Sequence, residues 1–381
     1  MPYLYNMSDI YGLGVRLENE LKLVRDRDIL DFVKALQSAH YSLSRIERYV
    51  VVLHLAADLM GKGLRDATRD DIEKFVMKAN SKKAWTRDTE LKMIKVFYRW
   101  LLTGSLDRNA PYPDIVKWIK TGVKRNELRE PDILTEEEVK ALIANAKTAR
   151  DKAIIAVLYD GGFRIGEILP AKIGDVSFDD MGAKIRVSGK TGGRTERLIA
   201  SVPLLSRWLD QHPEKGDPEA WLWESVQGKH LSYAKLQAML KRTAKKAGIK
   251  KRVYPHLFRH SSATANARYL TEYEMRLRYG WASGSDTPSR YVHMASADLD
   301  DKLAQIYKGK EAKPKAPEFV PVKCPRCGAD NTPGQRYCGK CGSPLNPEEI
   351  AKSALPDAEV LGELEELKRK LRELEDMLRK G

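Results

Sequence analysis

The sequence predicts a multidomain protein in which an all-α domain is followed by an α+β domain and by two small C-terminal elements. Three observations predict this architecture. The chain has 381 residues, whereas single domains commonly hold about 50 to 200. Apolar residues recur at helical spacing through the N-terminal quarter, and an alternating apolar and polar pattern around Gly-Gly comes later. Two pairs of cysteines and a charged helical segment follow near the end.

The all-α domain is predicted over residues 20–107. Ser42 can cap a helix that carries the apolar run SLSRIERYVVVLHLAADLMG and ends at Gly61. Thr68 and Asp71 have the spacing of a capping box at the start of the next helix. A third helix, TRDTELKMIKVFYRWLL, has apolar residues mainly on one face and basic residues largely on the other. These features predict a small helical bundle with basic faces.

A linker and the α+β domain are predicted next. Residues 108–132 contain three prolines and a basic stretch, and proline favours an extended path because it cannot continue a helix. The α+β domain, residues 133–308, begins with a capping box at Thr135 and Glu138. A buried helix follows, and then AKIRVSGK and TERLIASV flank TGGR, which predicts a β-hairpin. Helices continue to Ile306, so the domain mixes helices with a small antiparallel sheet.

The cysteines predict a zinc ribbon over residues 323–343, after a tether rich in lysine and proline at residues 309–322. Two Cys-x-x-Cys pairs are separated by ten residues, a spacing at which four thiolates can close a tetrahedral Zn²⁺ site. The ligands would be Cys324, Cys327, Cys338 and Cys341. Such a closed site would be structural and not catalytic. Disulfides are the alternative, and the ribbon has two open roles, contact with DNA and docking of a protein.

The last predicted element is an amphipathic helix at residues 355–380. Apolar residues from Val360 to Leu378 alternate four- and three-residue spacings, which is the seam of a coiled coil. The seam is short for an autonomous coiled coil. Self-association is favoured, with packing on the same chain or fraying in solvent as alternatives.

The charge of the chain indicates a polyanionic partner. There are 67 Lys plus Arg against 53 Asp plus Glu, which gives a formal net charge of +14. Nucleic acid suits this charge, and a basic protein without such a partner is the alternative. No run of eighteen apolar residues is present, so we expect no membrane span. The N-terminus lacks the pattern of a secretory signal, and we therefore expect a cytoplasmic protein.

Six residues of the second domain have side chains suited to phosphoryl transfer. They are Arg164, Lys190, His256, Arg259, Trp281 and Tyr291. A guanidinium presents a planar fork of donors to phosphate and stays protonated, and a lysine can give a proton to a leaving oxygen. An imidazole can relay a proton, an indole N–H can donate a hydrogen bond, and a phenol can form a covalent bond to phosphorus. Each residue alone is more often a surface charge or a core side chain, but their order and context together favour catalysis.

The segments FRIGE, HLFRH and GW…RYVHM resemble the recurrent boxes of the tyrosine recombinase (phage integrase) family, and the similarity spans roughly residues 26–306. The resemblance implies that the all-α domain is the family's core-binding (SAM-like) DNA-binding domain and that the α+β domain is catalytic. It implies a site-specific recombinase that breaks and rejoins double-stranded DNA as a tetramer on two duplexes. Neither ATP nor a catalytic metal would be needed, because a covalent 3′-phosphotyrosyl bond stores the energy of the broken linkage.

The same resemblance implies a role for each residue. Arg164 and Arg259 would hold the scissile phosphate while Tyr291 attacks it. Lys190 would protonate the leaving 5′-oxygen, and His256 would assist as a base.

Other positions in these segments complete the comparison. Trp281 stands where many relatives carry histidine, and Glu167 and Asp175 match positions that support the first arginine. Lys184 and Arg194 also lie in the predicted hairpin and are alternatives to Lys190. Lys190 is favoured because it follows a glycine.

The amino-acid sequence of the last box, GW…RYVHM, together with a C-terminal zinc ribbon, resembles archaeal members of the family. The same combination suits a mobile element. Two competing functions remain. A type IB topoisomerase would use similar chemistry on one duplex, and a non-enzymatic architectural protein would only bind DNA. The ordered set of six residues argues against the architectural protein, because a binding module needs no fixed tyrosine.

Overall fold

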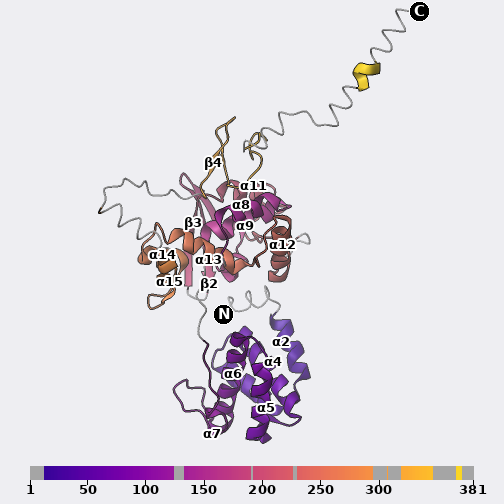
Figure 1. Ribbon diagram of the computed structural model, residues 1–381, viewed down its shortest axis with the longest axis vertical. Helices are drawn as coiled ribbons and strands as arrows, with labels where there is room; N and C mark the ends of the chain where they lie inside the picture. Colours follow the sequence, from indigo (N-terminus) through magenta and orange to yellow (C-terminus); the bar gives the residue numbers. More distant parts are fainter. Residues whose placement is uncertain are drawn as a thin grey trace, which may run out of the picture. The chain divides into compact units, whose positions relative to one another are not determined.

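The computed structural model describes residues 13–123, 133–189, 192–225, 230–294, 307, 319–345 and 366–370 (Figure 1). The chain divides into two compact units. The first comprises Met1–Leu128 with Leu231–Ala234, and the second comprises Arg129–His230 with Lys235–Gly381. Among the described residues, no helix combines the length and apolar character that crossing a membrane requires.

The first unit is helical, as the sequence predicts. Its elements are α2 (Leu13–Leu23), α3 (Arg27–Ser38), α4 (Leu43–Met60), the 3-10 helix η1 (Leu64–Asp66), α5 (Arg69–Asn80), α6 (Ala84–Thr103) and α7 (Asp114–Lys117). The predicted capping box of Thr68 and Asp71 opens α5. Ser42 precedes α4, but its side chain makes no capping hydrogen bond there. Gly61 ends α4 in the left-handed conformation.

Aromatic rings fill the centre of the first unit. Phe32 of α3 packs edge-on against Tyr49 of α4 and Phe97 of α6, with ring centroids 5.2 and 5.3 Å apart. Val116 and Ile119 belong to the same core. The structure therefore differs from the extended linker predicted over residues 108–132, because burial of these two side chains favours the short helix α7 despite the nearby prolines. Residues 124–132 of the predicted linker lie outside the described residues.

The second unit combines helices with a small antiparallel sheet. Its helices are α8 (Glu136–Asn145), α9 (Ala149–Gly161), α10 (Ile165–Ile168), η3 (Ile173–Asp175), α11 (Val202–Asp210), α12 (Tyr233–Lys246), α13 (Pro255–Asn266), α14 (Glu272–Tyr279) and α15 (Thr287–Met294). The strands β1 (Val176–Asp179), β2 (Gly182–Gly189) and β3 (Gly192–Leu198) lie in the order β1-β2-β3. β2 and β3 form the predicted hairpin, with Gly189 paired to Gly192. β1 was not predicted, because its mostly exposed side chains leave no alternating pattern.

Helix α9 lies at the centre of the second unit. Most of its residues are buried, and it packs against α8, α11 and α13. It is capped at its end by Gly162, whose φ is +56° and whose missing Cβ would lie 2.3 Å from the ring of Tyr279. Only glycine meets both the backbone and the space requirement. The chain therefore turns sharply here, two residues before Arg164.

Residues 319–345 form a small folded segment that carries the four cysteines. Its strands β4 (Val322–Lys323) and β5 (Asp330–Asn331) pair antiparallel. Of the helix predicted at residues 355–380, residues 366–370 are helical, and the rest of the coiled-coil seam lies outside the described residues. Most of the predicted tether at residues 309–322 also lies outside them.

Candidate active site and metal centre

Arg164 is held by a buried carboxylate at the start of α10. Its Nη1 donates to Oε1 of Glu167 over 2.7 Å, and its Nη2 donates to the carbonyl oxygen of Gly280 over 3.0 Å. The backbone N–H of Arg164 donates to the other oxygen of the same carboxylate. Glu167 is 3% exposed, whereas the arginine side chain is partly open to solvent. The guanidinium is thus fixed in direction while one edge stays free to meet a ligand.

Arg259 lies on α13 and is only 2% exposed. Its Nη1 donates to the carbonyl oxygen of Gly162 over 2.9 Å, and its Nη2 donates to that of Tyr279 over 2.5 Å. The guanidinium also lies over the rings of Tyr279 and Trp281. Burial, helped by the charge of Arg164, lowers the pKa of Arg259 to about 10. It stays protonated at neutral pH, so Arg259 adds a second cation to the region where Arg164 is paired with Glu167.

Tyr291 on α15 is 3% exposed and lies in the same region. Its ring stacks on Trp281, with centroids 5.4 Å apart and planes at 6°, and Trp281 in turn stacks on Tyr279. Its Oη lies 2.5 Å from Nδ1 of His260. Burial raises the pKa of Tyr291 to about 12, although the charge of Arg259 acts in the opposite direction. The phenol is therefore neutral at pH 7.

His260 is a site residue that the sequence analysis missed. The expected histidine, His256, lies one helical turn earlier on α13, with its ring edge-on to His260 at 4.7 Å. Desolvation, followed by the charges of Arg259 and Arg164, lowers the pKa of His256. Desolvation and the neighbouring His256 lower the pKa of His260 to about 4. The second histidine of HLFRH was the available signal, since residues four apart share a helix face.

The β-hairpin reaches the same site from the sheet. A Cβ on Gly189 would lie 2.9 Å from Cγ of Glu167, so the end of β2 lies directly against the carboxylate that holds Arg164. Lys190 follows Gly189 and lies outside the described residues. Of its two alternatives, Lys184 pairs with Asp179 at the far end of the sheet.

Arg194, the second alternative, lies inside the site as a positioning group. Its Nη1 is 2.9 Å from Oε1 of Glu167, and its Nε is 3.5 Å from Oε2 of Glu196. Burial raises the pKa of Glu196 to about 7, although the charges of Arg278 and Arg194 oppose this. Glu196 and Arg278 were not predicted as site residues, because their pairing depends on packing between β3 and α14.

Asp175 does not contact Arg164 in the structure. Its carboxylate accepts the backbone N–H of Lys172 over 2.9 Å and lies 3.2 Å from Nη2 of Arg186. Of these two residues Glu167 contacts Arg164, whereas Asp175 caps the short helix η3.

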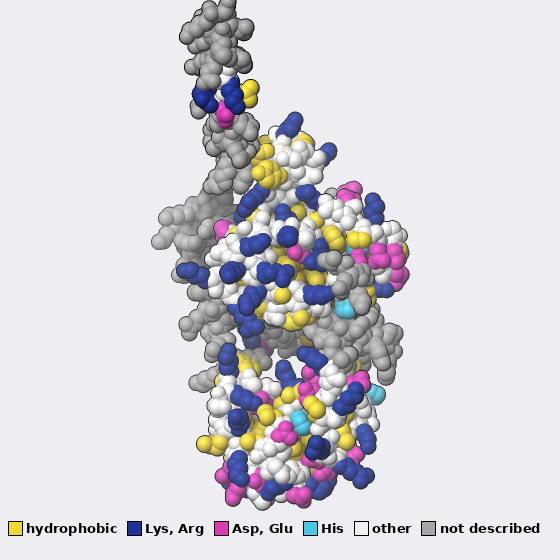
Figure 2. Space-filling model, turned by 90° about the vertical axis from the view of Figure 1, so that its right-hand side faces the viewer, with side chains coloured by type: hydrophobic (Ala, Val, Ile, Leu, Met, Phe, Trp, Pro, Cys, Tyr) yellow, Lys and Arg dark blue, Asp and Glu magenta, His cyan; other side chains and the backbone are white. Residues whose placement is uncertain are grey.

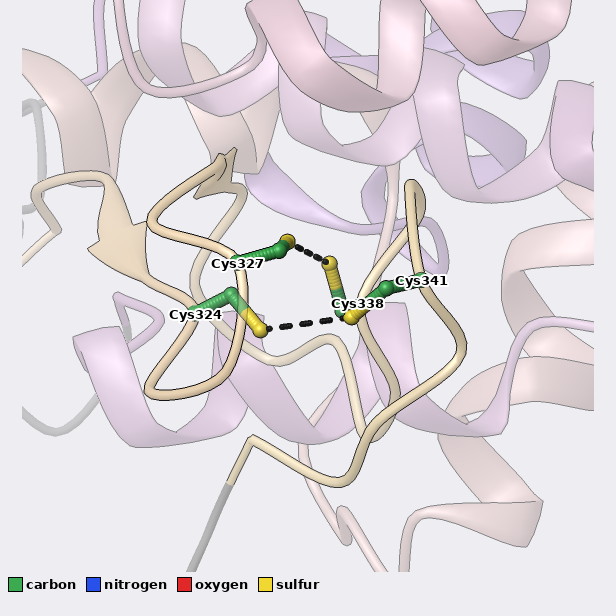
Figure 3. A group of neighbouring side chains, drawn as sticks. All are labelled: Cys324, Cys327, Cys338 and Cys341. Atoms are coloured by element: carbon green, nitrogen blue, oxygen red, sulfur yellow. Dashed lines mark hydrogen bonds between the residues drawn. The ribbon is translucent and has the colours of Figure 1, made fainter.

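The four cysteines lie together as the sequence predicts (Figure 3). Their Sγ atoms are all within 4.8 Å of one another. The Sγ atoms of Cys324 and Cys341 are 3.6 Å apart, and those of Cys327 and Cys338 are 3.7 Å apart. Tetrahedral zinc with Zn–S bonds of about 2.3 Å requires sulfurs about 3.8 Å apart, whereas a disulfide requires about 2.05 Å. The cysteine geometry therefore fits a tetrahedral metal ion and excludes disulfides in this structure.

Comparison with known proteins gives the class. The model of the phage integrase family matches residues 132–298. The tyrosine recombinase XerC of Alcanivorax borkumensis is 31% identical over 242 residues, which cover 59% of this chain and 72% of that protein. A tyrosine recombinase of Thermosipho africanus is 29% identical over 263 residues, covering 65% of this chain and 87% of that protein. The chain belongs to the phage integrase family of tyrosine recombinases, and it is a tyrosine-type site-specific recombinase.

Solved structures agree at the level of the fold. XerH bound to a palindromic difH substrate, in a post-cleavage complex, has a TM-score of 0.58 at 20% identity and covers 79% of this chain and 93% of that one. A lambda integrase dimer bound to a COC′ core site has a TM-score of 0.55 at 15% identity, with 69% and 75% covered. A second model, the Domain of unknown function (DUF7577), matches residues 321–346, which hold the cysteines. The predicted family is confirmed, and the archaeal type stays a prediction.

Proposed function

We propose that this recombinase cleaves double-stranded DNA through Tyr291, forming a covalent 3′-phosphotyrosyl intermediate without ATP or a catalytic metal. The observation that carries the proposal is the position of Tyr291. Its hydroxyl is hydrogen-bonded to His260, and its ring stacks on Trp281, over which the guanidinium of Arg259 also lies. A nucleophile from α15 and a proton acceptor and a fixed cation from α13 therefore lie in one place.

The proposed reaction begins with phosphate binding. Arg164 and Arg259 take the non-bridging oxygens of the scissile phosphate, with His256 as a further hydrogen-bond donor, and stabilise the charge that develops on these oxygens. The Oη of Tyr291 forms a bond to phosphorus as its proton passes to Nδ1 of His260. The bond to the 5′-oxygen breaks, and Lys190 gives that oxygen a proton.

Resealing is the reverse reaction with a different strand. The free 5′-hydroxyl of a partner duplex gives its proton back to Lys190 and attacks the phosphotyrosyl phosphorus, and Tyr291 leaves with the proton held by His260. One P–O bond is made for each one broken in both steps, so no external energy is required. Trp281 keeps the phenol oriented by stacking, and Glu167 holds the first arginine in place.

The domain roles follow the family pattern. Residues 20–107 would be the core-binding domain, 108–132 the linker and 133–308 the catalytic domain. In the first unit an open pocket of about 760 Å³ is lined by Arg45, Arg48 and the exposed indole of Trp85, among others, which suits phosphate contact and stacking. Figure 2 shows lysine and arginine side chains in dark blue over the visible face of each unit.

Related complexes support the proposed partners. XerH is bound to difH in one solved structure, and lambda integrase forms a tetramer on a Holliday junction in another. We infer that this chain also acts on duplex DNA as a tetramer, in which the predicted helix at residues 355–380 would help self-association. Transposase A from transposon Tn554 of Staphylococcus aureus is 29% identical over 213 residues, which supports a role of this recombinase in a mobile genetic element. The four cysteines would bind one structural Zn²⁺, which folds residues 323–343 as a ribbon and takes no part in the reaction.

A nicked suicide duplex tests the proposal. The wild-type chain, Tyr291→Phe and Tyr273→Phe are incubated with candidate sites and run on denaturing gels. Tyr273 is an exposed tyrosine of the same unit and serves as the matched control. We expect a protease-sensitive DNA–protein band with the wild type and the control, and tight DNA binding without that band for Tyr291→Phe. A band that survives in Tyr291→Phe refutes the assignment of the nucleophile, and supercoil relaxation without strand exchange would indicate a topoisomerase.

A further inference from the structure

The cysteine module (residues 319–345) is packed on the helices that build the recombinase site. Phe319 at its start is 8% exposed and meets the ring of Tyr159 on α9 edge-on, with centroids 4.8 Å apart. Thr332 is 1% exposed and accepts the backbone N–H of Leu204 on α11 over 3.3 Å. A Cβ on Gly334 would lie 2.5 Å from the carbonyl oxygen of Lys140 on α8. Three consecutive parts of the module thus contact three different helices.

The contact of Thr332 completes a helix end that lacks its own cap. Ser201 is the N-cap residue of α11, but its hydroxyl makes no capping bond and donates instead to Asp160 on α9 over 2.8 Å. The first N–H groups of a helix have no partner within the helix. Thr332, 128 residues further along the chain, supplies an acceptor for one of them.

The cysteine geometry holds this threonine in place. The side chain of Asn331 donates to the Sγ of Cys338 over 3.7 Å and accepts the backbone N–H of Gly339 over 2.9 Å. Thr332 follows Asn331, and its own N–H donates to Oε1 of Gln335 over 2.6 Å. The turn that presents the threonine is therefore built on the second cysteine pair.

The helix ends under the module lead directly to the catalytic arginines. Tyr159 and Asp160 lie in the last turn of α9, and the carbonyl oxygen of Gly162 just beyond accepts from Arg259. Arg164 follows two residues later. A movement of this helix end would shift the carbonyl that orients one arginine and the backbone that carries the other.

We propose that the cysteine module is a metal-dependent clamp on its own catalytic unit, which fixes the ends of α9 and α11 and thereby positions Arg164 and Arg259. Its partner is this surface of the same chain, and neither DNA nor a second protein. The proposal rests on the structural metal proposed above. It assigns a role to the segment matched by the domain of unknown function, and the module touches no reacting atom.

Two glycines of the module provide a matched test. Gly334 and Gly328 both have left-handed φ values, +87° and +70°, so alanine carries a similar backbone strain at each. Only Gly334 faces another element, because a Cβ on Gly328 meets nothing within 4 Å. The full chain with one equivalent of Zn²⁺ is compared with Gly334→Ala and Gly328→Ala by hydrogen–deuterium exchange. Bound zinc is measured for each protein.

We expect Gly334→Ala to retain its zinc but to exchange the amides at the start of α11 about fivefold faster, the factor for loss of one helix cap. Gly328→Ala should match the wild type, and Thr332→Val should reproduce the faster exchange without an added Cβ clash. Covalent cleavage by Gly334→Ala should fall while its affinity for DNA stays unchanged.

Unchanged exchange in α11 for both Gly334→Ala and Thr332→Val overturns the clamp. Loss of DNA affinity with unchanged exchange would instead make the module a DNA contact and also overturns it. Exchange is measured without DNA, so the result is independent of whether Tyr291 is the nucleophile.

Discussion

Replacement of His260 by phenylalanine tests how Tyr291 loses its proton. Phenylalanine keeps a planar ring on α13 but removes the Nδ1 that lies 2.5 Å from the phenol oxygen. Loss of a general base typically reduces a rate by about 10²- to 10⁴-fold. The buried hydroxyl would also be left without its partner, at about 1 to 3 kcal/mol. We therefore expect strand cleavage to slow at least about 100-fold at pH 7, with DNA affinity retained.

The pH profile separates proton transfer from simple misfolding. The pKa of His260 is about 4, so in the wild type the acceptor is available at all pH values above that, and cleavage should vary little between pH 6 and 8 for this reason. In His260→Phe the phenol, with a pKa of about 12, must lose its proton to solvent, and the rate should rise about tenfold per pH unit. His260→Gln, which can accept a hydrogen bond but not a proton, should show the same slope.

Single-turnover cleavage of the suicide duplex from pH 6 to 9 gives both quantities. A His260→Phe rate within twofold of the wild type, or a flat profile for this variant, would refute the role of His260 as proton acceptor. His256→Phe serves as the comparison, because His256 contacts the His260 ring and its loss should leave the slope of the profile unchanged.

Three further outcomes are expected. Gly162→Ala adds a clash with a buried ring to the strain of a left-handed residue and should lower the free energy of unfolding, measured in urea, by about 2 to 5 kcal/mol. Gly248→Ala, with φ +71° and open space around it, should lower it by only about 1 to 2 kcal/mol. Equal losses for the two variants would contradict the packing argument. Burial raises the pKa of Glu167, but Arg194 and Arg164 lower it by more. Arg194→Ala should therefore raise this pKa and move the acid limb of the pH profile of cleavage to higher pH. An acid limb at the wild-type pH would argue against the pairing of Arg194 with Glu167. The pKa of His260 is lowered on folding from 6.5 to about 4, so the unfolded chain binds this proton more tightly than the folded chain. The stability of the fold should therefore fall as pH drops through this window, by at most about 3 kcal/mol. His260→Phe should abolish this part of the decline when thermal unfolding is followed against pH.

The sequence predicts the parts of this fold that short-range chemistry determines. The capping boxes at Thr68 and Thr135 are four-residue patterns, and both are present at helix starts. The hairpin is similarly local, since alternation predicts its two strands. The Gly-Gly pair predicted as the turn instead begins β3, where Gly192 and Gly193 pair with Gly189 and Ser188. The cysteine cluster follows from the spacing of two pairs.

The contacts that the sequence did not reveal are set by packing between distant segments. His260 and Tyr291 are 31 residues apart, and their hydrogen bond depends on how α13 and α15 meet. Arg194 and Glu167 belong to a strand and a helix that the sequence does not place side by side. The helix α7 forms because apolar residues of this segment are buried in the core of the first unit, whereas the nearby prolines predict an extended segment.

The stacking of Tyr291 on Trp281 has a consequence for how subunits share the work. The proposed nucleophile packs on its proposed proton acceptor and on its stacking partner within its own chain, so we expect each subunit to cut the strand that its own arginines hold, in cis. A mixed assembly of Tyr291→Phe and Arg259→Ala subunits would then contain no complete active site. Such subunits should fail to complement each other, whereas a tyrosine delivered in trans would restore cleavage at half of the sites.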